Sequence, residues 1–147
     1  MGECRETIQE RPHRNLLIFG GPVLAYALLI FFLSSLQSFG HEVQFFRGFD
    51  KMVHFVEYFF FGGLICRWFT VMGGTRKRRM AFILTILIGT GYALSDEWHQ
   101  SFVPGRDASL WDVLFDAMGV AAGAATYRRL RGKAFDLEKE AGGRGLI

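Results

Sequence analysis

The apolar residues of this chain are gathered into long runs, and this distribution constrains the fold more than any other feature of the sequence. Half of the 147 residues are hydrophobic, and 16 of them are Phe. Polar residues crowd the first fifteen positions, the stretch 73–79 and the part after Tyr127. A helix needs about 20 apolar residues to cross a hydrocarbon core of about 30 Å. We therefore expect an all-α protein embedded in a membrane, with one domain because the chain is short.

Four apolar runs predict an integral membrane four-helix bundle over residues 16–127. We expect its helices at about 16–38, 52–72, 80–100 and 110–127. The first run follows a basic flank, as in a signal peptide, but it is too long for one and no small-residue cleavage site follows it, so we expect an uncleaved helix. The fourth run is less hydrophobic and contains Gly119 and Gly123, a spacing that allows two helix backbones to approach closely.

The distribution of Lys and Arg predicts the orientation of the bundle. These residues accumulate in the N-terminal segment 1–15, in the loop 73–79 and in the tail 128–147. Because cytoplasmic loops are enriched in Lys and Arg, both termini should be cytoplasmic, and the tail should fray. The loops 41–51 and 101–109 should then face outward. The net charge of +3 is explained by these membrane-flanking residues, so we expect a lipid bilayer and no nucleic acid as partner.

Ionisable residues lie at one end of three of the expected helices. Inside a membrane such residues are costly, and they usually face a bundle interior or a watery cavity. Residues three and four apart share a helix face, so each helix presents a polar stripe. In the expected orientation all three stripes lie at the outer face. We expect one cavity there, lined by His54, Glu57, Tyr58, Asp96, Glu97, His99, Asp112 and Asp116.

The charge of this outer group requires compensation. Seven carboxyl groups (Asp50, Glu57, Asp96, Glu97, Asp107, Asp112, Asp116) stand against three basic residues (Arg47, Lys51, Arg106). A partly desolvated group of this kind cannot remain fully ionised and unpaired. Some carboxyls could be protonated, the histidines could be charged, or a cation could bind. A divalent metal such as zinc or manganese suits His and carboxylate ligands, and the candidate ligands are His54, Glu97, His99, Asp112 and Asp116.

Structural explanations exist for the same residues. His54 and Tyr58 could form hydrogen bonds between helices. Asp112 could be the cap or the first-turn acid of the fourth helix, and the segment 107–109 could equally supply that cap. Arg106 could close its loop by pairing with Asp96 or Asp112. The sequence contains no H-E-x-x-H motif, no G-x-S-x-G elbow and no Gly-rich phosphate loop.

Two stretches between residues 49 and 123 resemble the signatures of the VanZ-like family. The first is Asp50-Lys51-x-x-His54-Phe55-x-x-Tyr58. The second is Tyr92-Ala-Leu-Ser-Asp96-Glu97-x-His99-Gln100-x-Phe-Val-Pro104-Gly105-Arg106, followed by Asp112, Gly119 and Gly123. The family commonly has Asn where this chain has Asp116, and Glu57 falls outside the shared pattern.

The resemblance implies a multi-pass protein of the bacterial cytoplasmic membrane, acting in the cell envelope. The family is named for a member linked to antibiotic resistance against the glycopeptide teicoplanin, whose target is exposed peptidoglycan precursor. Most relatives have no established biochemical activity, so the resemblance implies a location and not a reaction.

Three functions remain open at this point. An enzyme could modify an exported envelope precursor or a glycopeptide-type ligand, with Glu97 or Asp96 as general base, His54 or His99 as proton shuttle or ligand, and Arg106 binding a phosphate or carboxylate. Its candidate catalytic residues are His54, Asp96, Glu97, His99, Arg106 and Asp112. Alternatively, the chain is a non-enzymatic binder of a cation or peptide, or a small transporter that would need to form an oligomer. Finally, the polar cluster could serve only to fix helix packing.

Overall fold

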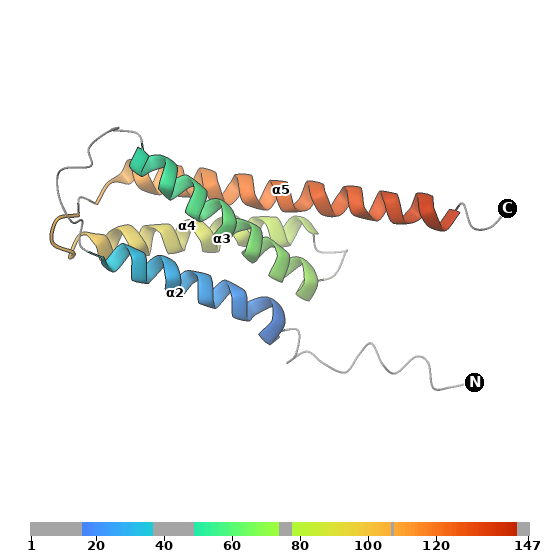
Figure 1. Cartoon of the computed structure of the whole chain (residues 1–147), viewed down its shortest axis with the longest axis horizontal. Helices are drawn as coiled ribbons and strands as arrows, with labels where there is room; N and C mark the ends of the chain where they lie inside the picture. Colours follow the sequence, from blue (N-terminus) through green and yellow to red (C-terminus); the bar gives the residue numbers. More distant parts are fainter. Residues whose placement is uncertain (1–15, 37–48, 74–77, 107, 144–147) are drawn as a thin grey trace.

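The computed structural model describes residues 16–36, 49–73, 78–106 and 108–143, and all regular structure within these ranges is helical. A short π-helical turn, η1 (Leu16–Gly20), leads into α2 (Gly21–Ser35). The other helices are α3 (Phe49–Gly73), α4 (Arg78–Gln100) and α5 (Leu110–Gly143). Figure 1 shows the four α-helices gathered into one bundle. The prediction of an all-α bundle is confirmed.

Some expectations concern parts of the chain outside the described residues. These are the N-terminal segment 1–15, the end of the first helix beyond residue 36, most of the loop 41–51, Arg76 and Lys77, Asp107, and the last four residues. The side chain of Asp50 also lies outside the description.

Three helical segments are long and apolar enough to cross a membrane: Leu16–Ser35, Lys51–Gly73 and Arg78–Gln100. They contain 20, 23 and 23 residues, so each is at least about 30 Å long. Large apolar side chains cover their outer surfaces, with Leu17 73% exposed and Leu24 63% exposed. A surface of this kind is suited to lipid rather than to water. The helical segments therefore support a membrane protein.

Helix α5 is much longer than its apolar part. It continues to Gly143, so the expected helix end at Tyr127 is wrong, and the backbone of residues 128–143 is helical where we expected fraying. The physical reason is local, because this stretch consists mainly of Arg, Leu, Lys, Ala and Glu, which are good helix formers. Figure 1 shows the C-terminal part of α5 extending beyond the other helices.

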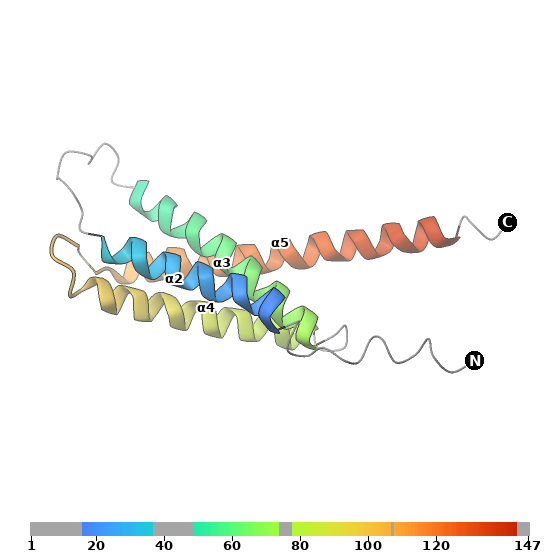
Figure 2. The ribbon, with the colours of Figure 1, turned by 60° about the horizontal axis from the view of Figure 1, so that its bottom comes forward.

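Helices α3 and α5 are in contact through their backbones. A β-carbon at Gly119 would fall against the carbonyl oxygen of Phe55, and one at Gly123 against that of Phe59. From the other side, a β-carbon at Gly62 would meet the backbone of Val120. Figures 1 and 2 show α3 running obliquely across α5. The close approach that the spacing of Gly119 and Gly123 allows is therefore present in the structure, and α3 is the partner helix.

The remaining helices pack on this pair through apolar side chains and two tyrosine hydroxyls. Side chains from all four helices form the core: Ile30, Tyr58, Phe61, Ile65, Ala93, Val113 and Val120. The Tyr26 hydroxyl of α2 donates to the carbonyl of Glu57 at 3.2 Å. The Tyr92 hydroxyl of α4 donates to the carbonyl of Ala27 at 2.6 Å. In a hydrocarbon environment a hydroxyl needs such an internal acceptor, so these two bonds help to fix the position of α2.

The glycine contact leads to a first prediction. Gly123→Ala should force α3 and α5 apart and destabilise the protein by about 1–3 kcal/mol, as overpacking does. Gly132→Ala in the same helix has nothing within 4 Å of the new β-carbon and should be neutral or slightly stabilising. Thermal unfolding of both variants in detergent would measure the difference. Equal midpoints for the two variants would contradict the backbone contact.

Candidate functional site

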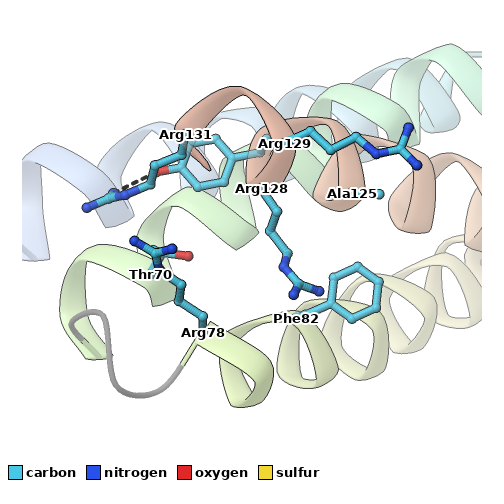
Figure 3. Close-up of a pocket in the computed structure, with 8 residues that line it drawn as sticks. Thr70, Arg78, Phe82, Ala125, Arg128, Arg129 and Arg131 are labelled. Carbon is cyan, nitrogen blue, oxygen red and sulfur yellow. Dashed lines mark hydrogen bonds between the residues drawn. The ribbon is translucent and has the colours of Figure 1, made fainter. Parts of the chain in front are cut away.

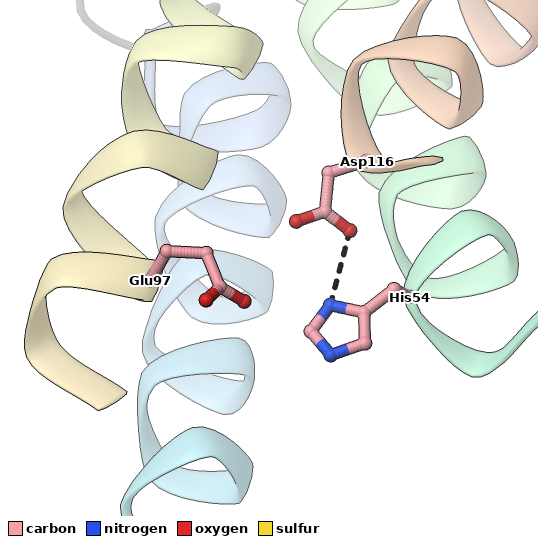
Figure 4. A group of neighbouring side chains, drawn as sticks. All are labelled: His54, Glu97 and Asp116. Carbon is pink, nitrogen blue, oxygen red and sulfur yellow. Dashed lines mark hydrogen bonds and ion pairs between the residues drawn. The ribbon is translucent and has the colours of Figure 1, made fainter. Parts of the chain in front are cut away.

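Three buried side chains from three different helices meet near one end of the bundle. They are His54 of α3, Glu97 of α4 and Asp116 of α5, and they are 6%, 6% and 0% exposed. One possible ligand atom from each lies within 4.8 Å of the other two. Figure 4 shows the Glu97 carboxylate pointing from its helix toward the other two side chains. We call these three residues the acidic triad.

A direct hydrogen bond joins two members of the acidic triad. His54 Nδ1 lies 3.1 Å from Asp116 Oδ1, and this bond links α3 to α5. The glycine contact explains the alignment, because Gly119 is three residues after Asp116 and packs on Phe55, the neighbour of His54. The second carboxylate oxygen of Asp116 is buried and has no hydrogen-bond partner among the described residues.

Glu97 is held in place by the start of α5. Its Oε2 accepts a hydrogen bond from the backbone N–H of Ser109 at 2.8 Å. Ser109 caps α5, because its Oγ accepts from the N–H of Trp111 at 3.2 Å and its carbonyl accepts from the N–H of Asp112 at 2.9 Å. Ser109 is thus the cap, and Asp112 is an acid of the first turn. The other carboxylate oxygen of Glu97 is buried and has no partner within the described part of the chain.

A tight turn sets the distance between α4 and α5. The N–H of Arg106 donates to the carbonyl of Val103 at 3.2 Å, with Pro104 and Gly105 between them. Gly105 has a φ of 82°, the left-handed conformation that the third position of a type II turn requires. Pro at the second position and Gly at the third match this turn, so the local sequence itself brings Glu97 and Ser109 together.

Asp112 and Asp96 are beside the acidic triad but have their own partners. Asp112 Oδ1 pairs with Lys51 Nζ at 2.7 Å, and the Asp112 side chain is nearly buried whereas that of Lys51 is 32% exposed. Asp96 Oδ2 accepts from the side-chain amide of Gln100 at 3.0 Å on the same helix. The other carboxylate oxygen of Asp96 is buried without a partner among the described residues.

His99 lies away from the acidic triad. Its ring stacks on Phe31 at 4.5 Å between centroids, and its Nε2 is 3.0 Å from the Ser35 hydroxyl. Of the five expected metal ligands, the structure brings together His54, Glu97 and Asp116; it places His99 against α2 and Asp112 against Lys51. Ser35 was not among the residues expected at the site, although the Ser34-Ser35 pair near the end of the first helix was a visible signal.

Three further residues that we expected at the site, Arg106, Tyr58 and Glu57, are not part of the acidic triad. Arg106 lies in the turn and, among the described residues, makes no ion pair with Asp96 or Asp112, so this alternative for closing the loop is not seen in the structure. Tyr58 is fully buried, and its hydroxyl has no partner within the described ranges. The side chain of Glu57 is half-buried on α3.

The acidic triad and the neighbouring Asp96 together offer more hydrogen-bond acceptors than donors. Asp96, Glu97 and Asp116 each leave one buried carboxylate oxygen without a hydrogen-bond partner in the described structure. Buried polar atoms are nearly always paired, so each of these oxygens indicates a missing proton, donor or cation. The arrangement is chemically suited to bind a cation, and the acidic triad supplies one imidazole and two carboxylates for it.

Comparison with known proteins identifies one family. The VanZ/LLP1 family model matches residues 6–131, which include every member of the acidic triad. No curated protein and no solved structure matches the chain.

The Lys51–Asp112 pair generates a second prediction. Lys51→Met should destabilise the protein, because it leaves a nearly buried carboxylate without its cation. Asp112→Asn should also destabilise, and the double variant should fall short of the sum by about 0.5–3 kcal/mol. The measurement is the midpoint of thermal unfolding in detergent.

A matched control for this cycle uses a distant arginine. Arg131 lies in the later part of α5 and bonds to Tyr127 instead. Arg131→Met should therefore combine additively with Asp112→Asn. An additive result for Lys51 and Asp112 as well would show that their contact contributes nothing.

Proposed function

We propose that this chain, which belongs to the VanZ/LLP1 family, is a cell-envelope membrane protein whose acidic triad binds a divalent metal ion. The observation that carries this proposal is the convergence of His54, Glu97 and Asp116, with ligand atoms within 4.8 Å of one another. Buried oxygens of Glu97 and Asp116 that have no hydrogen-bond partner among the described residues add a second, independent indication.

The geometry needs only a small contraction to fit a metal. Zinc binds His nitrogen and carboxylate oxygen at about 2.0–2.2 Å, which in a tetrahedron separates ligand atoms by about 3.4 Å. Side-chain rotation can bring atoms within 4.8 Å of one another to that separation. Glu97 can supply its Oε1 while its Oε2 stays bonded to Ser109. The cap of α5 would then remain intact when the ion binds.

Charge balance favours a divalent ion. Two carboxylates and one imidazole lie in a site that is more than nine-tenths buried. Unpaired charges are costly at such a place, and an ion of charge +2 offsets both carboxylates. The ligand set contains nitrogen and oxygen and no thiolate, which suits zinc or manganese. Three protein ligands also leave a coordination position open, as in zinc sites that bind water or substrate.

The expected orientation supports an exported ligand. Among the described residues, Arg78 and Arg79 at the start of α4 and the arginines within 128–131 of α5 are separated along their helices from the acidic triad, and such basic clusters are typical of the cytoplasmic side. The triad then belongs to the outer half of the cytoplasmic membrane. We propose that the open metal position receives a phosphate or carboxylate of an envelope precursor or of a glycopeptide-type ligand, with Arg106 as a nearby cation.

A purely structural role is the second candidate, and specific contacts favour it. The His54–Asp116 bond links α3 to α5, and the Glu97–Ser109 bond links α4 to α5. Both bonds would hold the bundle together without any ion. The two candidates predict different effects when a carboxylate is replaced by an amide of the same shape. The metal site predicts a loss of bound metal, whereas the structural role predicts a loss of stability alone.

Metal analysis gives a third prediction. The protein purified from cells grown with zinc and manganese should contain about one such ion per chain, as a single three-ligand site holds. Glu97→Gln and Asp116→Asn should lose most of it, because each removes a charged ligand while keeping an oxygen that accepts the bond from Ser109 or His54. Asp112→Asn is the matched control and should keep the ion. Elemental analysis by mass spectrometry measures all four proteins.

The same proteins separate the two candidates. If the wild-type protein contains no metal and its unfolding midpoint does not rise with added zinc or manganese, the metal proposal is wrong. Lower midpoints for Glu97→Gln and Asp116→Asn under those conditions would establish the structural role.

A fourth prediction tests the orientation. Ser101→Cys should react with a membrane-impermeant maleimide in intact cells, because the turn after α4 should face outward. Lys133→Cys should react only after the cells are permeabilised. The unsubstituted chain, which contains Cys4 and Cys66, provides the background. The reverse labelling pattern would place the acidic triad on the cytoplasmic side and remove the exported ligand.

A further inference from the structure

A pocket of about 360 Å³ lies at the far end of the bundle from the acidic triad. It is formed where α3 ends, α4 begins and α5 passes between them, and its lining includes Thr70, Phe82 and Arg128. Twelve or more residues separate these positions from the triad along each helix, a distance of about 20 Å. The pocket is therefore a second site, and its role does not depend on the function proposed for the triad.

The lining of this pocket is strongly basic. Four arginines take part, Arg78 from α4 and Arg128, Arg129 and Arg131 from α5, and none of the described lining residues is acidic. Like charges gathered in one pocket repel each other, and a bound anion relieves that repulsion. Each guanidinium has five N–H donors in a planar fork that matches the oxygens of a phosphate.

The contacts of Arg128 and Arg131 leave most of the N–H donors of these two residues available. The Arg128 guanidinium stacks over the Phe82 ring at 4.9 Å, which orients it without using its N–H groups. Arg131 donates one bond, of 3.0 Å, to the Tyr127 hydroxyl. Figure 3 shows Arg78 and Arg128 reaching into the region between α4 and α5 from opposite sides, whereas Arg129 extends in another direction. Arg78 and Arg128 come from the two helices on either side of the pocket, so an anion bound there would have a guanidinium on each side.

The surroundings favour a lipid over a soluble anion. Apolar Phe82 and Ala125 are part of the lining, and Leu130, which lies among the arginines on α5, is 63% exposed. The pocket lies at the ends of two helices that are long enough to span a membrane, where headgroups are found. Its volume lies within the range of about 300–1,000 Å³ that is typical of ligand sites.

We propose that this pocket binds the phosphate of an anionic phospholipid headgroup, with Arg78 and Arg128 as its main ligands. Basic pockets between membrane helices on the cytoplasmic side are suited to anionic headgroups, and arginine forms charge-assisted bonds to phosphate oxygens. The apolar residues beside the pocket then contact the acyl chains. The bound lipid links the start of α4 to the middle of α5.

The test compares three probes on the purified full-length chain in a neutral detergent. They are short-chain phosphatidylglycerol, phosphatidylcholine with the same acyl chains, and inorganic phosphate, with binding measured by native mass spectrometry. We expect phosphatidylglycerol to bind at least about tenfold more tightly than phosphatidylcholine, because each arginine near the surface contributes about fivefold. Inorganic phosphate should bind weakly, because it lacks the acyl chains.

The variants isolate the two arginines. Arg78→Gln combined with Arg128→Gln should weaken phosphatidylglycerol binding by about 25-fold. Arg79→Gln combined with Lys133→Gln removes the same charge from the same two helices at exposed positions outside the pocket lining, and should weaken binding by less than about threefold. If the first pair fails to fold, Arg78→Lys combined with Arg128→Lys keeps the charge but loses the forks, and should still bind several-fold more weakly.

Three results would overturn the proposal. Equal affinity for the two lipids would show that the pocket does not select an anionic headgroup over a zwitterionic one. Equal losses in the two charge-matched pairs would show attraction to the surface charge alone. Tight binding of inorganic phosphate that depends on Arg78 and Arg128, with no gain from the lipid, would assign the pocket to a soluble phosphate compound instead.

Discussion

The backbone contact between α3 and α5 is the constraint on which the rest of this structure depends. Gly119 and Gly123 lie against the carbonyls of Phe55 and Phe59, so the two helices approach more closely than side chains would permit. This contact sets the register in which His54 and Asp116 face each other across the interface. It also lets α5, which is rich in Gly and Ala and carries two Asp residues in its first turns, pack closely on α3 although α5 is not among the helices apolar enough to span a membrane.

The carboxylate oxygens in and near the acidic triad that are unpaired in the described structure have few possible partners other than a ligand. On a soluble surface, a carboxylate oxygen without a protein partner can bind solvent, but a buried oxygen inside a helix bundle depends on partners within the protein. Asp96, Glu97 and Asp116 each contribute such an oxygen. The His54–Asp116 bond and the Glu97–Ser109 cap fix the side chains that surround them, so the acceptors are held together before any ligand arrives. A preorganised excess of acceptors is the physical basis for the proposed metal ion.

The two ends of the bundle are chemically opposite. One end holds the acidic triad and the Lys51–Asp112 pair, and the other holds an arginine pocket between α4 and α5. Both ends use α5, which carries Asp116 toward one surface and Arg128 toward the other. A single glycine-rich helix thus connects the site proposed for an ion with the site proposed for a lipid phosphate. The long helical extension to Gly143 continues from the arginine end.

The helical class, the position of the apolar segments and the glycine pair could be predicted from the sequence, because these depend on local composition and on spacing along one helix. The sequence also indicated the polar ends that form the site. Which polar residues meet is a property of the folded bundle, because helix rotation and partner choice follow from packing between segments distant in the chain. His99 shares the end of α4 with Glu97 yet stacks on Phe31, and Asp112 shares a face with Asp116 yet pairs with Lys51. The contact between α3 and α5 paired His54 with Asp116, and the bond to Ser109 placed Glu97 beside them.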